Sequence, residues 1–88
     1  MLDNTSLTPI LLDLARTAAP RLGDVAGDPR TANLREAGMT SVAAVRFMLE
    51  IEAAFDIAIP DSELTPENFS NVETVERLIL RIKASVAH

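Results

Sequence analysis

The sequence predicts an all-α fold, a small four-helix bundle with three longer helices, one short helix and a long loop between helices 1 and 2. Apolar residues recur at three- and four-residue spacing in three stretches, which is the period of a helix with one buried face. Residues that cap helices stand at the start of each stretch. The one alternating stretch, residues 55–60, has no second strand to pair with, so no sheet is expected.

The chain of 88 residues is expected to form a single domain over residues 1–88. It contains no cysteine, so neither a disulfide bond nor a thiolate zinc site can stabilise it, and its only histidine, His88, is the last residue. We therefore expect no metal site and no histidine-based catalytic arrangement. Three phenylalanines are the only aromatic residues, so the core must be mainly aliphatic.

Thirteen acidic residues against eight basic ones give a formal net charge of −5. This balance disfavours nucleic acid, whose phosphates require a basic surface, and favours either basic protein partners or solubility alone. No apolar run approaches the roughly 18–20 residues of a membrane span, and the N-terminus lacks the layout of a secretory signal. We expect a cytoplasmic protein that binds no nucleic acid and no membrane, and nothing in the sequence requires more than a monomer.

The first helix is expected to begin with Thr8 as its N-cap and Pro9 as its first helical residue. Pro20 and Gly23 mark its end. Its predicted buried stripe consists of Leu7, Ile10, Leu11, Leu14 and Ala18. Residues 21–38 are then predicted to form a long loop, because turn formers recur through them, and a loop of this length in a small domain is often functional.

The second helix is expected to span about residues 40–55, because two good N-cap residues stand at its start. Its predicted core stripe consists of Ala44, Phe47, Met48, Ile51 and Phe55. Val42 and Leu49 fall near Arg46, away from this stripe. Two apolar residues together on the outer face of a helix indicate a docking surface for a partner.

Residues 55–60 are interpreted as an extended connector that inserts its isoleucines into the core. Thr65 and Pro66 have the chemistry of an N-cap and a first helical residue, which predicts a short third helix. A capping box at residues 70–73 predicts the start of the last helix. The apolar stripe of that helix consists of Val72, Val75, Ile79, Ile82 and Val86. We also expect Phe55, Ile59 and Phe69 to be buried.

Two segments resemble the acyl carrier proteins and the related peptidyl carrier domains. The first is LREAGMTSV at residues 34–42, where the family has a leucine, a glycine, an aspartate, the serine and a leucine at the start of its second helix. The second is EIEAAFDIAIP at residues 50–60, which matches a glutamate-rich turn, a phenylalanine and a hydrophobic connector ending in Ile-Pro. The resemblance covers nearly the whole chain and is closest over residues 34–80.

The resemblance implies that a phosphopantetheinyl transferase uses coenzyme A and magnesium to place 4′-phosphopantetheine on Ser41. The thiol of this arm then holds acyl or aminoacyl groups as thioesters. The implied function is a stand-alone acyl carrier protein rather than an enzyme. Its further partners are a ligase that loads the acyl or aminoacyl group and a downstream acyltransferase or synthase. The candidates for an acyl pocket are Met48, Ile51, Ile59, Leu64 and Phe69.

Ser41 at a helix start also suits this chemistry physically, since free N–H groups and the helix dipole favour an attached phosphate. The alternative interpretation of Ser41 is a plain N-cap. The sequence departs from the family pattern at Thr40, which replaces the usual aspartate.

The docking candidates are Val42, Arg46, Leu49 and Glu52. Arg46 stands where fatty-acid-type carriers commonly have an acid, and it would repel a basic partner, so a specialised aminoacyl, lipopeptide or polyketide-type pathway is expected. A simple ion pair with Glu50 is the other explanation of Arg46. The alternative functions are a carrier for fatty-acid synthesis and an unmodified acidic helical interaction module. A serine enzyme is poorly supported, because no base is positioned to activate Ser41.

Overall fold

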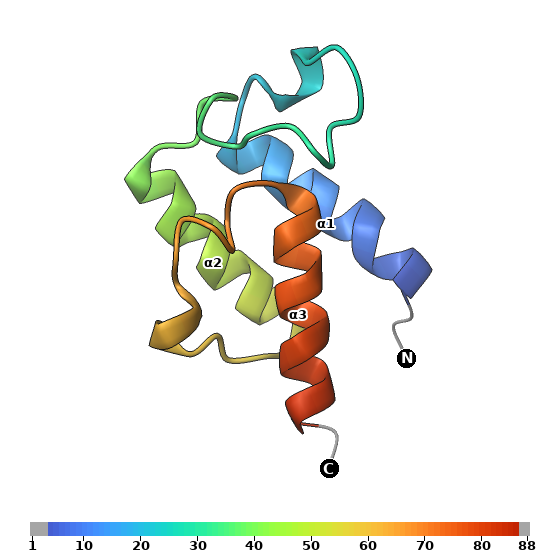
Figure 1. Ribbon diagram of the computed structural model, residues 1–88, viewed down its shortest axis with the longest axis vertical. Helices are drawn as coiled ribbons and strands as arrows, with labels where there is room; N and C mark the ends of the chain where they lie inside the picture. The colour runs from blue at the N-terminus through green and yellow to red at the C-terminus, as the bar shows by residue number, and fades with distance from the viewer. Residues whose placement is uncertain (1–3, 87–88) are drawn as a thin grey trace.

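The computed structural model describes residues 4–86, with the side chains of residues 7–85 (Figure 1). The elements in chain order are α1 (Asn4–Ala18), the 3₁₀ turn η1 (Leu22–Asp24), α2 (Ser41–Phe55), the 3₁₀ turn η2 (Asp61–Glu63) and α3 (Val72–Val86). No β-strand occurs within residues 4–86. The predicted all-α bundle with a long loop between the first two helices is therefore confirmed.

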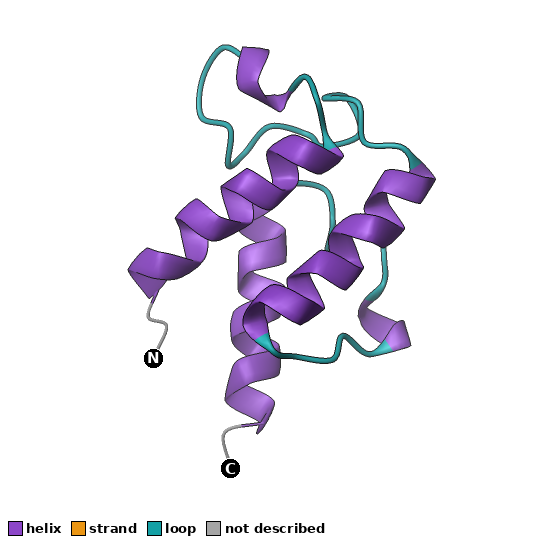
Figure 2. Cartoon of the chain, turned by 180° about the vertical axis from the view of Figure 1, so that it is seen from behind, coloured by secondary structure: helices purple, strands orange, loops and turns teal. Residues whose placement is uncertain are grey.

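The three α-helices form a bundle in which α1 packs against both α2 and α3. From behind, α1 and α2 lie in front and α3 crosses behind them (Figure 2). After α2 the chain turns back and runs alongside that helix before it enters α3 (Figure 1). The segment between α2 and α3 thereby becomes a neighbour of the start of α2.

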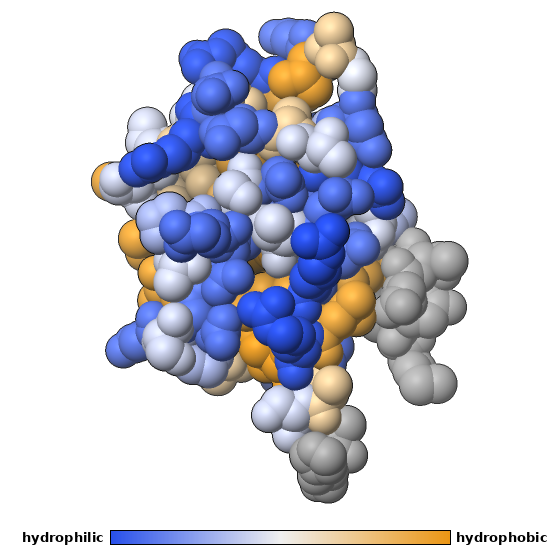
Figure 3. Space-filling view, viewed as in Figure 1, coloured by the Kyte–Doolittle hydropathy of each residue, from blue (hydrophilic) through white to orange (hydrophobic). Residues whose placement is uncertain are grey.

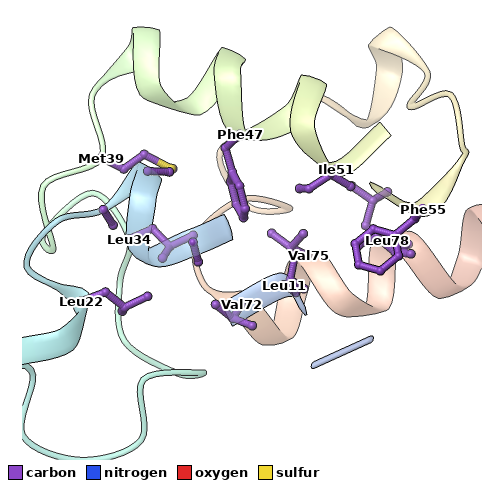
Figure 4. Packing of buried hydrophobic residues seen from close by; sticks show 14 of the residues in the cluster. Leu11, Leu22, Leu34, Met39, Phe47, Ile51, Phe55, Val72, Val75 and Leu78 are labelled. Carbon is purple, nitrogen blue, oxygen red and sulfur yellow. The ribbon is translucent and has the colours of Figure 1, made fainter. Parts of the chain in front are cut away.

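The core fills the space between the helices and is aliphatic apart from two phenylalanines (Figure 4). No polar or charged residue is buried among those whose burial the structure describes. Of the predicted stripes, Leu7, Leu11, Ala18, Phe47, Ile51, Phe55, Val72, Val75, Ile79 and Ile82 are buried. The side chain of Val86 and the whole of His88 lie outside the described residues. Hydrophobic periodicity thus identified the face that each helix turns to the core.

Two element boundaries differ from the sequence prediction. Helix α1 begins at Asn4 rather than after Thr8, so Pro9 lies inside it. The longer helix buries Leu7 one turn before Leu11. The stabilisation from burying this side chain offsets the loss of the backbone hydrogen bond that Pro9 cannot donate. The short helical element also comes earlier than Thr65, as η2, and only a turn follows at residues 66–69.

Local interactions at the helix ends explain where α3 begins and where α2 ends. The Asn71 side chain accepts a hydrogen bond from the Thr74 N–H (2.8 Å), and the Thr74 hydroxyl accepts one from the Asn71 N–H (3.3 Å). This reciprocal capping box lies one residue beyond the predicted 70–73. At the other end of the bundle, Asp56 adopts the left-handed conformation (φ 54°), and Lys83 donates to the Phe55 carbonyl (3.2 Å).

Backbone hydrogen bonds fasten the long first loop to the entrance of α3. The Leu34 N–H donates to the Ser70 carbonyl (2.9 Å), and the Glu73 N–H donates to the Arg30 carbonyl (3.1 Å). The Arg30 guanidinium also lies 3.5 Å from the Glu73 carboxylate. The loop is therefore an ordered part of the bundle, and its far end delivers the chain to Ser41 in a defined position.

Candidate functional site

Ser41 is the first residue of α2, and its side chain is exposed. The N-cap is Thr40: its hydroxyl oxygen accepts a hydrogen bond from the Ala43 N–H (3.1 Å), and its carbonyl accepts one from the Ala44 N–H (2.8 Å). Interpreting Ser41 as a plain N-cap is therefore wrong. The neighbouring threonine performs that task, and the serine hydroxyl is presented to solvent at the start of the helix.

The approach to Ser41 depends on Gly38, which has a φ of +106°. An added Cβ there would lie 3.3 Å from Cδ of Pro20, so both the backbone conformation and the close contact favour glycine. After this turn Met39 enters the core, and its N–H donates to the Leu34 carbonyl (3.0 Å). Burial of Met39 in turn directs the following residues outward, to the surface where α2 begins.

An open groove of about 610 Å³ begins at Ser41. Helix α2 contributes Ala44, Val45 and Met48 to one wall, and residues 64–70 contribute the other. Three of the five pocket candidates, Met48, Leu64 and Phe69, line this groove. The other two, Ile51 and Ile59, are buried in the core and are not among its lining residues.

Phe69 is only half-buried, which corrects the expectation that it is a core residue. Its ring meets the buried Phe47 ring edge to face, with centroids 6.5 Å apart and planes at 77°. One face of Phe69 is thereby anchored to the core, while the residue also lines the groove. The reason is that the 64–70 segment lies outside the helical layer, so Phe69 packs against the core on one side and borders the groove on the other.

The outer wall of the groove is tied to α3 through a small polar network. The Asn68 amide donates to the Glu63 carbonyl (2.8 Å) and to the Glu63 carboxylate (3.0 Å). Arg81 on α3 pairs with the same carboxylate (3.1 Å). These contacts hold residues 63–68 in place, so the groove is a formed feature of the protein.

Apolar side chains follow the outer face of α2 next to Ser41. Val42 is 75% exposed, Val45 55% and Leu49 54%. Val42 and Leu49 were predicted from the sequence to lie on this face. Val45 was not, although its position three residues after Val42 and four before Leu49 indicates the same face. Hydrophobic side chains reach the surface along the edge of the molecule where α2 lies (Figure 3). A row of exposed apolar residues this close together is characteristic of an interaction surface.

Arg46 is exposed on the same helix and makes no ion pair within the described part of the chain. The pair with Glu50, considered from the sequence, is not formed. One Glu50 carboxylate oxygen is instead buried without a hydrogen-bond partner. The positive charge of Arg46 is therefore available to a partner.

Glu52, the fourth docking candidate, has a structural contact. It is half-buried, and its carboxylate accepts a hydrogen bond from the Ile59 N–H (2.7 Å). This contact fastens the connector after α2 and helps keep Ile59 in the core. A docking role for Glu52 stays a prediction.

Replacing Glu52 with alanine is expected to lower the free energy of unfolding by about 1–3 kcal/mol, because the Ile59 N–H loses a charged acceptor. Urea denaturation measures this difference. The control is Glu36→Ala, which removes an exposed carboxylate that accepts no hydrogen bond within the described region. Equal stability losses in the two variants would show that the contact with Ile59 contributes nothing.

Within residues 4–86, no three His, Cys, Asp or Glu side chains come together as a possible metal site. In the same region, none of the helices has the length and apolar character needed to span a bilayer.

A small helical bundle that presents a serine at a helix start, beside a groove and an apolar helix face, defines a carrier domain. Residues 12–80 match the family described as PP-binding, phosphopantetheine attachment site. The chain belongs to this family, whose cofactor is covalently attached 4′-phosphopantetheine. The site fits such a group, since the exposed hydroxyl can take a phosphodiester and a groove of about 610 Å³ has the size of pockets that hold small ligands.

Two curated relatives are aminoacyl carrier proteins. The chain is 53% identical over 49 residues to aminoacyl carrier protein 1 of Bradyrhizobium diazoefficiens, which is 56% of this chain and 54% of that protein. It is 44% identical over 45 residues to the aminoacyl carrier protein of Agrobacterium fabrum, which is 51% of this chain and 54% of that one. The matches thus span about half the length of these relatives.

Solved structures extend the similarity over most of the fold. One is a crystal structure of Bradyrhizobium japonicum glycine:[carrier protein] ligase complexed with cognate carrier protein and an analogue of glycyl adenylate. The TM-score is 0.71 and the identity 38%, over 85% of this chain and 96% of that chain. The second is the same ligase complexed with glycylated carrier protein, with a TM-score of 0.68 and 40% identity over 82% of this chain and 96% of that chain.

Proposed function

We propose that this protein carries aminoacyl groups on a 4′-phosphopantetheine arm attached to Ser41. The observation that supports this most directly is the exposed Ser41 hydroxyl at the start of α2, beside the groove, with the capping task taken by Thr40. The arm supplies a terminal thiol, which forms thioesters with carboxyl groups and which this cysteine-free chain lacks.

The surroundings of Ser41 favour the attachment. No acidic residue occurs in the first turn of α2, and the N–H groups of Ser41 and Val42 have no acceptor within the described residues, so a phosphate at this place meets positive potential. In the attachment step the Ser41 oxygen forms a bond to the pantetheine-side phosphorus of coenzyme A. The phosphoanhydride bond breaks, adenosine bisphosphate leaves, and the serine proton is released. The catalytic groups and the magnesium ion for this step belong to the transferase.

Two observations support aminoacyl cargo over fatty acids. The curated relatives are aminoacyl carriers, and the similar solved structures contain a glycine ligase with its carrier. In addition, Arg46 is exposed and positive on the face that would meet a partner, which disfavours partners with basic docking surfaces. A phosphopantetheinyl transferase, an aminoacyl-loading ligase and a downstream acyltransferase or synthase are the partners of this function. A carrier for fatty-acid synthesis and an unmodified interaction module are the alternatives.

Incubation with coenzyme A, magnesium and a broad-specificity phosphopantetheinyl transferase is expected to add one phosphopantetheine to the wild-type protein and none to Ser41→Ala. Intact-mass spectrometry measures the addition. The matched control is Ser62→Ala, because Ser62 is also exposed but lies in η2. The modified protein is then incubated with ATP, free amino acids and an aminoacyl:carrier ligase, and is expected to gain the mass of one aminoacyl group.

The results discriminate between the candidate functions. Addition to Ser41→Ala would place the attachment elsewhere, and no addition to wild type by several transferases would favour the unmodified module. A modified protein that accepts fatty acyl groups from an acyl ligase but no amino acid would favour the fatty-acid alternative.

A further inference from the structure

The groove beside Ser41 has an uneven distribution of charge. Among the described residues that line it, only Arg35 and Glu67 are charged, and they come from different walls. Glu67 belongs to the 64–70 wall, whereas Arg35 belongs to the turn that leads into α2. The positive charge of the groove therefore comes from the segment that immediately precedes Ser41.

The Arg35 side chain is not engaged elsewhere in the described structure. It is exposed and takes part in no ion pair or side-chain hydrogen bond among residues 7–85, and only its carbonyl is used, as acceptor for the Gly38 N–H (3.0 Å). Two other arginines of the same loop are engaged: Arg21 donates to the Glu36 carbonyl (2.7 Å), and Arg30 pairs with Glu73. Arg35 is thus a free guanidinium on the rim of the groove.

The backbone that carries Arg35 is held firmly. Leu34 before it is buried and donates to the Ser70 carbonyl (2.9 Å), while the Ala37 N–H donates to the Leu34 carbonyl (3.1 Å). The same Leu34 carbonyl accepts from the Met39 N–H (3.0 Å). Because these bonds join the turn to the start of α2, the backbones of Arg35 and Ser41 are held in a defined relative position, and the Arg35 side chain stays free to reach a ligand in the groove.

A phosphodiester on Ser41 would meet favourable groups at this place. Thr40 is neutral, and the first turn of α2 contains no acidic residue to repel an anion. A guanidinium can donate two parallel hydrogen bonds to two phosphate oxygens, whereas the ammonium group of a lysine acts as a point charge without this planar geometry. The free cation on the groove rim therefore matches the one anionic group that attachment would bring into the groove.

We propose that Arg35 binds the phosphodiester of the arm and directs the first part of the arm along the groove. This inference rests on the proposed attachment at Ser41 and goes beyond it, since it assigns a phosphate-binding residue outside α2. Arg35 is a positioning residue: it takes no part in bond formation at the thiol, and it determines where the arm begins its path.

The test compares unmodified and phosphopantetheine-bearing forms of wild type, Arg35→Gln and Arg46→Gln. Arg46 is a suitable control because it is also an exposed, unpaired arginine near Ser41 but does not line the groove. At low ionic strength, attachment is expected to raise the Tm of wild type and of Arg46→Gln by at least about 4 °C. Most of this rise is expected to disappear in Arg35→Gln, and in wild type at high salt. The ³¹P resonance of the diester is expected to shift in Arg35→Gln only.

Each form is compared with its own unmodified counterpart, so a general loss of stability in Arg35→Gln does not affect the result. Arg35→Lys is expected to keep part of the Tm rise, since it retains the charge but loses the two-pronged geometry. An equal Tm rise and an unchanged ³¹P resonance in Arg35→Gln would overturn the assignment, as would an equal loss in Arg46→Gln. Failure of wild type to take up phosphopantetheine refutes the attachment itself, and mass spectrometry distinguishes the two cases.

Discussion

Phe55→Ala is expected to lower the free energy of unfolding by about 3–5 kcal/mol, which is a large part of the stability of a domain of this size. Phe55 is 1% exposed at the end of α2 and packs near Leu78 of α3 (Figure 4). Its carbonyl also accepts the hydrogen bond from Lys83, so α2 and α3 meet at this residue. Truncation would leave a cavity that two helix ends held by such contacts cannot easily close.

Urea denaturation followed by circular dichroism measures this loss. The control is Val42→Ala, because Val42 is the most exposed of the large apolar residues described and its truncation removes little buried surface. The control is expected to change stability by no more than about 0.5 kcal/mol. If Phe55→Ala loses no more free energy of unfolding than Val42→Ala, the end of α2 does not belong to the cooperative core.

Leu49→Ala is expected to reduce kcat/KM for aminoacyl loading by roughly tenfold, with little change in Tm. Leu49 is 54% exposed and continues the apolar row of Val42 and Val45 on the outer face of α2. A ligase that reaches the arm on Ser41 would cover this row. Truncation then removes apolar contact from the complex but not from the free protein.

Loading is measured with the phosphopantetheine-bearing protein and its aminoacyl ligase, over a range of carrier concentrations. Leu80→Ala is the matched control, because Leu80 is also an exposed leucine but lies on α3. It is expected to leave kcat/KM unchanged. An equal reduction in both variants, or none in Leu49→Ala, would mean that the ligase does not bind the outer face of α2.

Features that depend on local chemistry could be predicted from the sequence. The three apolar stripes determined the fold class and most of the core, since helical periodicity places residues three and four apart on one face. Gly38, followed by the capping residue Thr40 and by Ser41, predicted the start of α2 correctly. The resemblance of residues 34–80 to carrier proteins then indicated the family that the comparisons confirm.

Features that depend on how segments meet required the tertiary structure. Thr40 and Ser41 both suit an N-cap, and only the backbone at the start of α2 shows that Thr40 caps while Ser41 is exposed. Ile51 and Phe69 were likewise both predicted to line an acyl pocket, and nothing in the sequence distinguished them. Ile51 proved to be completely buried in the core between the helices, whereas Phe69 lines the groove because its segment lies outside the helices.

The polar contacts show the same distinction. Neither the hydrogen bond from the Ile59 N–H to the Glu52 carboxylate nor the presence of Arg35 and Ser41 in one groove follows from any spacing in the chain. Each depends on where a loop returns to the bundle, and that is decided by long-range packing. The helices, most of their buried faces and the serine at the start of α2 could therefore be predicted from local patterns along the chain. Which side chains share the groove could not be predicted in this way, because the groove forms where segments distant in sequence lie against one another.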